Sequence, residues 1–350
     1  MDAAKSGADA GRAAAAAALR ACEGWEFRTF LCGTRPPPGL PAAEADAFRR
    51  AANRALGVAL EEAWRGERTV EFTRPEAHLT ASYPSGAVEV ATIPLPVYGR
   101  YRKHSRSLAQ TPFHCPECRG GRGRRGRPRG PCAACGGTGR LVPGSVAEFV
   151  LPLLVEAAGA EDGAFQGCGR EDADVRMLGR GRPFVVTLRR PRRRALDLEA
   201  IRLRADAAAA GAADFPLLRA IGPDAAAAVP ATHPPKRYRA RVEVEGGASA
   251  EDAARLAEGL RGATLAQRTP ARVARRRADL VRERRVLDAA ARRLEEGAID
   301  LEVRTEGGTY VKEMISGDDG RTAPSASSIL GRPCRCVELD VLEVELEDPA

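Results

Sequence analysis

Acidic and basic residues are concentrated in one short segment of the chain, from Gly169 to Gly179. Its sequence, GREDADVRMLG, holds three acids and two arginines in eleven residues, shows no helical or strand period, and has a glycine at either end. Cations beside a carboxylate favour its charged form, as a base or nucleophile at neutral pH requires. Asp172 and Asp174 are therefore candidate catalytic residues. The same composition also fits a solvated surface turn, because runs of charge usually face water.

Four of the nine cysteines form two CxxC pairs. Thirteen residues separate the pair Cys115 and Cys118 from the pair Cys132 and Cys135. This spacing is typical of two zinc knuckles that close one tetrahedral site, and four thiolates with no open position make the zinc structural. The alternative is four free cysteines, which would leave the glycine- and arginine-rich segment between the pairs with little to order it.

The chain is basic, with a formal net charge of +8. Its arginines gather in three runs, at residues 119–129, 189–194 and 272–285. Arginine binds phosphate through paired hydrogen bonds and stacks on bases, so these runs favour a polyanionic partner such as RNA. A high genomic GC content enriches arginine, alanine and glycine together, so part of the arginine excess carries no functional information.

Two groups of elements must position these residues. In the first, apolar residues at three- and four-residue spacing predict a helix over 41–65, and alternating runs predict strands at 69–73, 77–83 and 87–93. In the second, Ser145 and Glu148 have capping-box spacing before an apolar helix. Strand-like runs follow at 183–188, 238–244, 299–304 and 337–346, alternating with predicted helices at 196–209, 250–260 and 287–296. The sequence therefore predicts an α+β protein of two domains, residues 1–140 and 141–350.

Several motifs resemble, in wording and order, those of one family of RNA-modifying enzymes. They are FQGCGREDADVRMLGRGRPF from Phe165, KRYRARV from Lys236, QRTPARVARRRADLVRERRV from Gln267, YVKEMISGDDGRTAPSASSILG from Tyr310 and CVELDV from Cys336. Upstream, FRTFLCGT and GRYRKHSRSLAQTPFHCPEC belong to the same series. Together they are similar to the archaeal and eukaryotic tRNA pseudouridine synthases that act on positions 54 and 55 of the TΨC arm, and the resemblance extends over most of the chain.

This resemblance implies a fold for each domain. Residues 1–140 would form a THUMP-like α+β RNA-binding domain with the zinc knuckle at 115–135, and residues 141–350 a pseudouridine synthase domain with a mixed, largely antiparallel sheet. Many members carry a further CxxC near the N-terminus. Cys22 and Cys32 do not form one, which predicts a shortened or altered start to the first domain.

The resemblance also implies roles for single residues. Asp172 would be the catalytic aspartate, with Asp174 ordering the loop and Lys312 pairing with the aspartate. Whether Asp172 attacks C1′ of the ribose, attacks the uracil ring or removes the C2′ proton stays open. Substrate binding would involve Lys312 together with Tyr238, which would stack on the uracil, Leu339, Arg170 and Arg321. Taken as single residues, Tyr238 and Leu339 are also compatible with positions in the hydrophobic core. Lys312 is also compatible with an exposed surface position.

The predicted function is the isomerisation of uridine to pseudouridine in tRNA at position 54, 55 or both. The reaction would need no cofactor and no guide RNA, and we expect a cytoplasmic monomer, since no apolar run is long enough to span a membrane. One alternative is a non-catalytic zinc-containing RNA-binding protein, which the set of Asp172, Tyr238 and Lys312 disfavours. Another is a THUMP-containing RNA methyltransferase, which would need a glycine-rich cofactor loop that we do not find.

Overall fold

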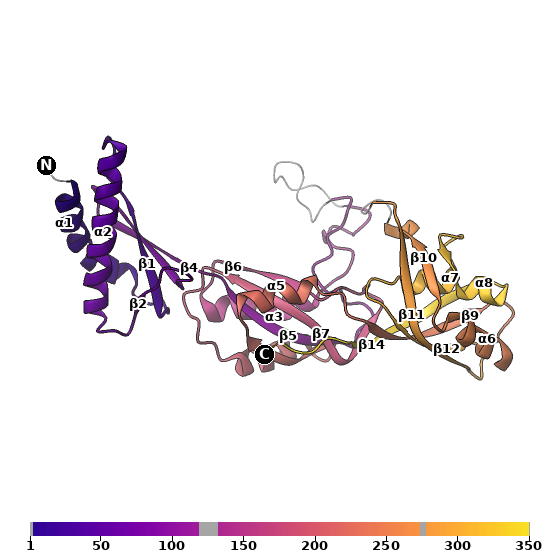
Figure 1. Cartoon of the computed structure of the whole chain (residues 1–350). Coiled ribbons are helices and arrows are strands. Elements are labelled where there is room, and N and C mark those ends of the chain that lie inside the picture. The colour runs from indigo at the N-terminus through magenta and orange to yellow at the C-terminus, as the bar shows by residue number, and fades with distance from the viewer. Residues whose placement is uncertain (1–2, 119–131, 274–277, 350) are drawn as a thin grey trace. The chain divides into compact units, whose positions relative to one another are not determined.

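The structure is a computed structural model that describes residues 3–118, 132–273 and 278–349 (Figure 1). The chain forms two compact units. The first comprises Met1–Pro96, Leu153–Ala164 and Thr187–Asp197, and the second comprises Val97–Pro152, Phe165–Val186 and Leu198–Ala350. The arginine run at 119–129 lies outside the described residues. The predicted domain boundary near residue 140 stays a prediction, and the contacts divide the chain at other positions.

The first unit contains two helices and a four-stranded sheet. The helices are α1 (Ala3–Ala21) and α2 (Ala42–Ala63). The sheet has the order β2 (Thr69–Val70), β1 (Thr29–Arg35), β3 (Ala77–Ser82), β4 (Ala87–Thr92). Strand β1 is parallel to both its neighbours, and β3 and β4 form an antiparallel hairpin. The helix and strands predicted between residues 41 and 93 are therefore present, whereas β1 was not predicted.

Helices α1 and α2 approach each other closely because α1 carries glycine where they meet. A Cβ atom on Gly7 would lie 2.4 Å from the carbonyl oxygen of Phe48, and one on Gly11 would lie 2.4 Å from that of Ala52. Both distances are far below van der Waals contact, so a larger residue at either position would force the helices apart.

The second unit is built around a ten-stranded sheet. Its strand order is β13 (Thr322–Ala323), β10 (Thr264–Arg268), β11 (Val281–Arg293), β12 (Ile299–Thr305), β9 (Lys236–Val244), β14 (Cys334–Val344), β7 (Arg176–Arg189), β5 (Leu95–Lys103), β8 (Ala213–Ala220), with β6 (Asp162–Gly167) paired to β7. The pairs from β13 through β14 are antiparallel, as are β5 and β8, while β14 and β7 are parallel. The predicted α+β class with a mixed, largely antiparallel sheet is confirmed.

Short helices accompany this sheet: α3 (Val146–Ala158), α4 (Leu198–Ala209), α5 (Pro223–Ala231), α6 (Ala250–Leu260), α7 (Val311–Ser316) and α8 (Ala326–Leu330), with a 3-10 turn at Ala271–Val273. Ser249 caps α6 through a capping box with Asp252, and α7 packs against β14. Within the described residues, no helix is both long and apolar enough to cross a lipid bilayer.

The helix predicted at 287–296 is wrong, because most of this segment belongs to strand β11. Its alanines, arginines and leucines favour a helix by intrinsic propensity. The segment nevertheless pairs with β12, where Ala289 is opposite Val303 and Ala291 is opposite Leu301, and helix α6 packs against β11. Strand β10 pairs only with the earlier part of β11, residues 281–285. Pairing with β12 satisfies backbone groups along the segment, and this tertiary context overrides the local preference.

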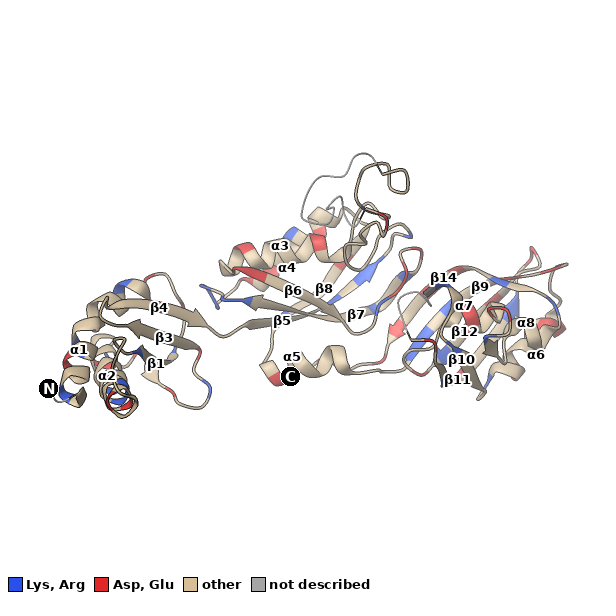
Figure 2. Ribbon diagram, turned by 90° about the horizontal axis from the view of Figure 1, so that it is seen from above, with Lys and Arg blue, Asp and Glu red and all other residues tan. Residues whose placement is uncertain are grey.

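Basic and acidic residues both occur along the helices and strands of the two units (Figure 2). Many of the arginines form ion pairs with acids of the same chain. Asp300 on β12 accepts hydrogen bonds from Arg239 at 2.7 and 2.6 Å and forms an ion pair with Arg292 at 2.7 Å. In the run at 189–194, Arg193 donates to the carbonyls of Glu156 and Ala157. Part of the arginine excess therefore stabilises the fold.

Candidate active site

Residues 169–175 of the acidic segment form a loop between β6 and β7, and the rest of the segment begins β7. Glu171 holds this loop through buried contacts. The Glu171 side chain is only 1% exposed and forms an ion pair with the buried Arg182 of β7 at 2.8 Å. The hydroxyl of Tyr101 on β5 donates to the Glu171 carboxylate, at 2.9 and 3.0 Å from its two oxygens. Glu171 is thus fully occupied in holding the loop, which leaves the two aspartates of the segment as its reactive candidates.

Lys103 at the end of β5 and Gln110 beyond it hold the backbone of the same loop. Gln110 donates from Nε2 to the carbonyl of Gly169 at 2.9 Å and to the hydroxyl of Tyr101 at 2.8 Å. The ammonium of Lys103 donates to the carbonyls of Asp172 at 3.1 Å and Ala173 at 2.9 Å. Neither Gln110 nor Lys103 was singled out by the sequence, although both lie in the motif that starts at Gly99.

The carboxylate of Asp172 projects from this fixed backbone between two cations. Its side chain is 42% exposed, and its Oδ2 lies 3.0 Å from Nη1 of Arg272 and 3.4 Å from Nζ of Lys312. Asp172 thus forms an ion pair with each of two cations. The arrangement provides an accessible and oriented carboxylate, which is the group that a base or nucleophile requires.

Lys312 lies closer to Asp174 than to Asp172. Its Nζ is 2.7 and 2.9 Å from the two carboxylate oxygens of Asp174. Partial burial raises the pKa of Asp174, but the hydrogen bond and charge of Lys312 outweigh this effect and hold the pKa below its ordinary value. Lys312 therefore lies near both aspartates. Its contact with Asp172, with which it was predicted to pair, is longer than its contact with Asp174.

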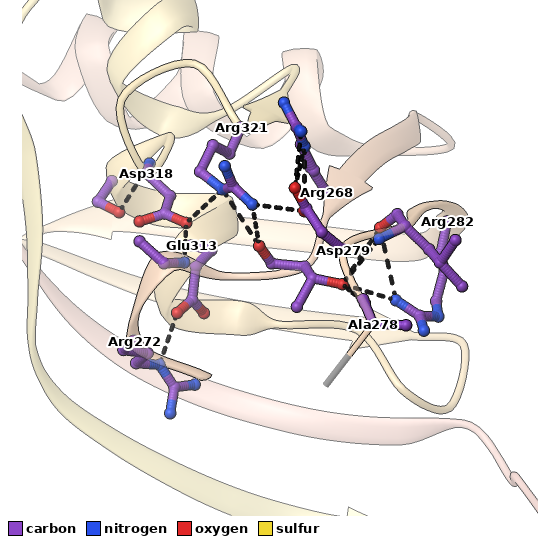
Figure 3. A network of polar contacts seen from close by, with 12 residues as sticks. Arg268, Arg272, Ala278, Asp279, Arg282, Glu313, Asp318 and Arg321 are labelled. Carbon is purple, nitrogen blue, oxygen red and sulfur yellow. Dashed lines mark hydrogen bonds and ion pairs between the residues drawn. The ribbon is translucent and has the colours of Figure 1, made fainter. Parts of the chain in front are cut away.

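Arg272 is held in turn by Glu313 on α7 (Figure 3). Nε of Arg272 donates to Oε1 of Glu313 at 2.6 Å, and the Glu313 side chain is only 6% exposed. The guanidinium therefore bridges Glu313 and Asp172. Sequence reasoning missed both Arg272 and Glu313, although Glu313 follows Lys312 directly and Arg272 lies within the motif that starts at Gln267.

Tyr238 and Leu339 lie on neighbouring strands near the end of the acidic loop. Tyr238 on β9 is opposite Val341 on β14, and Val341 is opposite Met177 at the start of β7. Tyr238 is buried, and burial raises its pKa to about 12, so its phenol is neutral at physiological pH. Leu339 is buried on β14 opposite Ala240. The register brings both residues toward the loop, and their contact with substrate stays a prediction.

Arg170 and Arg321, the two arginines that were predicted to bind substrate, differ in their surroundings. Arg170 is exposed, and its guanidinium has no hydrogen-bond or ion-pair partner in the part of the chain that the structure describes. Arg321 is occupied: it donates to the carbonyl of the buried Thr269 at 2.6 Å and to Asp279 at 2.7 Å (Figure 3). Arg321 thus fixes the segment that leads to Arg272, whereas Arg170 is free to meet a ligand.

The four predicted metal ligands come together. The Sγ atoms of Cys115, Cys118, Cys132 and Cys135 all lie within 4.8 Å of one another. The sulfurs of Cys115 and Cys132 are 3.9 Å apart and those of Cys118 and Cys135 are 3.6 Å apart. A tetrahedron with zinc–sulfur bonds of about 2.3 Å has edges of about 3.8 Å, so this cluster could hold a metal ion such as zinc.

Comparison with known proteins decides the family. The family model described as "Pus10, C-terminal" matches residues 97–345, which include the acidic loop, Arg272 and Lys312. This chain belongs to the Pus10 family. A Pus10 relative from Halorubrum lacusprofundi is 38% identical over 345 residues, covering 95% of this chain and 79% of the relative. One from Korarchaeum cryptofilum is 44% identical over 275 residues, covering 78% and 71%. Both are named tRNA pseudouridine synthase Pus10.

Solved structures show a weaker likeness to this Pus10-family chain. The "Crystal Structure of a Cbf5-Nop10-Gar1 Complex" is 15% identical, covers 70% of this chain and 58% of its own, and gives a TM-score of 0.35. The "Structure of H/ACA RNP bound to a substrate RNA containing 2'-deoxyuridine" is 16% identical, covers 57% and 43%, and gives 0.33. Likenesses at this level add nothing to the family assignment.

Proposed function

We propose that this chain is a tRNA pseudouridine synthase that isomerises uridine at position 54, position 55 or both, with Asp172 as its catalytic residue. The observation that carries the proposal is the half-exposed Asp172 carboxylate, which lies between Arg272 and Lys312. Its loop is held by the buried ion pair of Glu171 with Arg182. Membership of the Pus10 family supports the same reaction. Because the isomerisation consumes no electrons and releases no atoms, one carboxylate suffices, and we infer that catalysis needs no cofactor.

Binding of the target uridine would involve the residues around the loop. A base removed from its stack needs an aromatic or apolar wall, which Tyr238 and Leu339 would supply. Arg170, exposed on the loop, would contact a phosphate. Lys312 would pair with Asp172, from which its Nζ is 3.4 Å away. Arg321 would contact the substrate while its guanidinium stays bonded to the Thr269 carbonyl and to Asp279.

A structural zinc ion at the four cysteines is part of the proposal. The sulfur separations support tetrahedral coordination. The amide of Gly139 donates to Sγ of Cys135 at 3.2 Å, which suits a thiolate ligand. With four thiolate ligands the ion would hold the segment together and take no part in the reaction.

The decisive experiment is to incubate the purified protein with an unmodified tRNA transcript and no other RNA. Pseudouridine is then mapped by carbodiimide treatment and primer extension. We expect a stop at position 54, position 55 or both with the wild-type protein, and none with Asp172→Asn. Formation of pseudouridine under these conditions also tests action without a guide RNA, and size-exclusion chromatography tests the monomer. Tight tRNA binding without any pseudouridine would favour the non-catalytic RNA-binding protein instead.

A further inference from the structure

Lys103 is a fully buried lysine beside the candidate active site. It is the last residue of β5, and its side chain is among the largest that are completely buried. Its Nζ donates three hydrogen bonds, to the carbonyls of Leu108 at 2.8 Å, Asp172 at 3.1 Å and Ala173 at 2.9 Å. An ammonium group has three N–H donors, so the three carbonyls match its capacity completely.

This arrangement is costly for stability. Burying a charge lowers stability unless the charge is well compensated, and an apolar residue of similar volume often does better. Among the described residues, no carboxylate lies within ion-pair distance of Lys103, whose bonded partners are all backbone oxygens. Two of those oxygens belong to Asp172 itself and to its neighbour, so the charge is placed where it fixes the backbone of the candidate catalytic residue.

We propose that Lys103 is a positioning residue, which fixes the backbone of Asp172 and Ala173 so that the Asp172 carboxylate meets the target uridine in a productive orientation. The inference rests on the proposed function, in which Asp172 is catalytic. Small displacements of a reacting group cost large factors in rate, since proximity and orientation supply much of the rate acceleration. Lys103 would therefore affect turnover and leave the affinity for tRNA unchanged.

The protonation state of Lys103 gives this role a specific signature. A neutral amine has two N–H donors and a lone pair, so one of the three carbonyls would face the lone pair instead of a donor. Burial lowers the pKa of Lys103 to about 8, although the nearby acids Glu171, Asp174 and Asp172 oppose the shift and Arg182 adds to it. Turnover should accordingly decline as the pH rises above about 8.

The chain offers a matched control in Lys236. This lysine is also buried, and burial lowers its pKa to about 8 as well. Its Nζ, however, donates to the carbonyl of Pro234 at 2.9 Å and to no atom of Asp172. Lys103→Met and Lys236→Met thus each remove one buried cation, and only the first removes a bond to the catalytic loop.

The experiment measures kcat and KM for tRNA between pH 6.5 and 9.5 for the wild type and both variants, with folding followed by circular dichroism. We expect Lys103→Met to lower kcat on the order of 100-fold with KM unchanged, and to abolish the decline in kcat above pH 8. Lys236→Met should keep that decline. An active Lys103→Met variant with the wild-type rate and pH profile would overturn the inference while leaving the proposed function intact.

The wild-type profile covers the case in which Lys103→Met does not fold. A wild-type kcat that stays constant from pH 7 to 9.5, with the protein folded, contradicts the inference without any variant. A wild-type protein that forms no pseudouridine at any pH contradicts the proposed function, and the role of Lys103 falls with it.

Discussion

Nη1 of Arg272 lies 3.0 Å from Oδ2 of Asp172, closer than the 3.4 Å between Lys312 Nζ and the same oxygen. The nearer cation is therefore the one that sequence motifs did not identify. Arg272 is itself fixed by the buried Glu313, so the position of the Asp172 carboxylate depends on a bridge between two acids. This bridge and the buried contacts of the loop lead to three predictions, and the four cysteines lead to a fourth.

Replacing Asp172 with Asn should abolish turnover and leave folding and tRNA binding in place. The change keeps the side-chain volume and removes the charge, on a side chain that is already 42% exposed. We expect a loss of several orders of magnitude in kcat, with the thermal midpoint unchanged. Asp174→Asn is the control, since it removes the stronger partner of Lys312 and should cost far less. A residual rate above about a tenth of the wild type, or ~1.4 kcal/mol of barrier, would rule out Asp172 as the catalytic residue.

Arg272→Ala and Glu313→Gln should each reduce kcat, and their effects should not add. In the described part of the chain, Glu313 makes no hydrogen bond or ion pair with Asp172, and it acts through the guanidinium of Arg272. In the Arg272→Ala variant the guanidinium through which Glu313 acts is gone, so the further change at Glu313 should have little additional effect on kcat. We expect losses of roughly tenfold for each single variant, and a double variant close to Arg272→Ala. Equal and additive losses would show that the two residues act separately.

The sequence predicted the residues to which the resemblance assigns a role, and it missed partners whose role is visible only in the fold. Asp172, Asp174 and Lys312 lie in motifs that are recognisable by their own wording. The partners of Asp172 at Arg272 and Lys103 are separated from it by 100 and 69 residues, respectively. Their role depends on strand order and register, which local periodicity does not determine. The same limit explains β11, in which the segment predicted as a helix forms a strand because it pairs with β12.

Zinc should be present at about one ion per chain, and it should be lost on replacing Cys115 or Cys132 with Ser. The four sulfurs lie within 4.8 Å of one another, so each contributes one corner of a closed site. We expect the variants to be less stable and to bind tRNA more weakly, with turnover at saturating tRNA little changed, since the cysteines take no part in the reaction. Cys334→Ser, outside the cluster, is the control. Elemental analysis that finds no zinc in protein purified without chelator would exclude the site.

Lys103 should make the free energy of unfolding increase as the pH rises above about 8, the range in which its proposed role makes turnover decline. Burial lowers its pKa from an ordinary value of 10.5 to about 8 in the folded chain. Between these two pH values, the unfolded chain binds a proton that the folded chain does not, so the free energy of unfolding increases with pH. The free energy of unfolding of the wild type should therefore increase relative to that of Lys103→Met between pH 7.5 and 9.5, by on the order of 1 to 3 kcal/mol at most. The comparison with the variant cancels the titration of groups that both proteins share, such as the cysteines. Urea unfolding at the two pH values measures this difference, and a difference that stays constant or shrinks as the pH rises would mean that burial does not lower the pKa of Lys103.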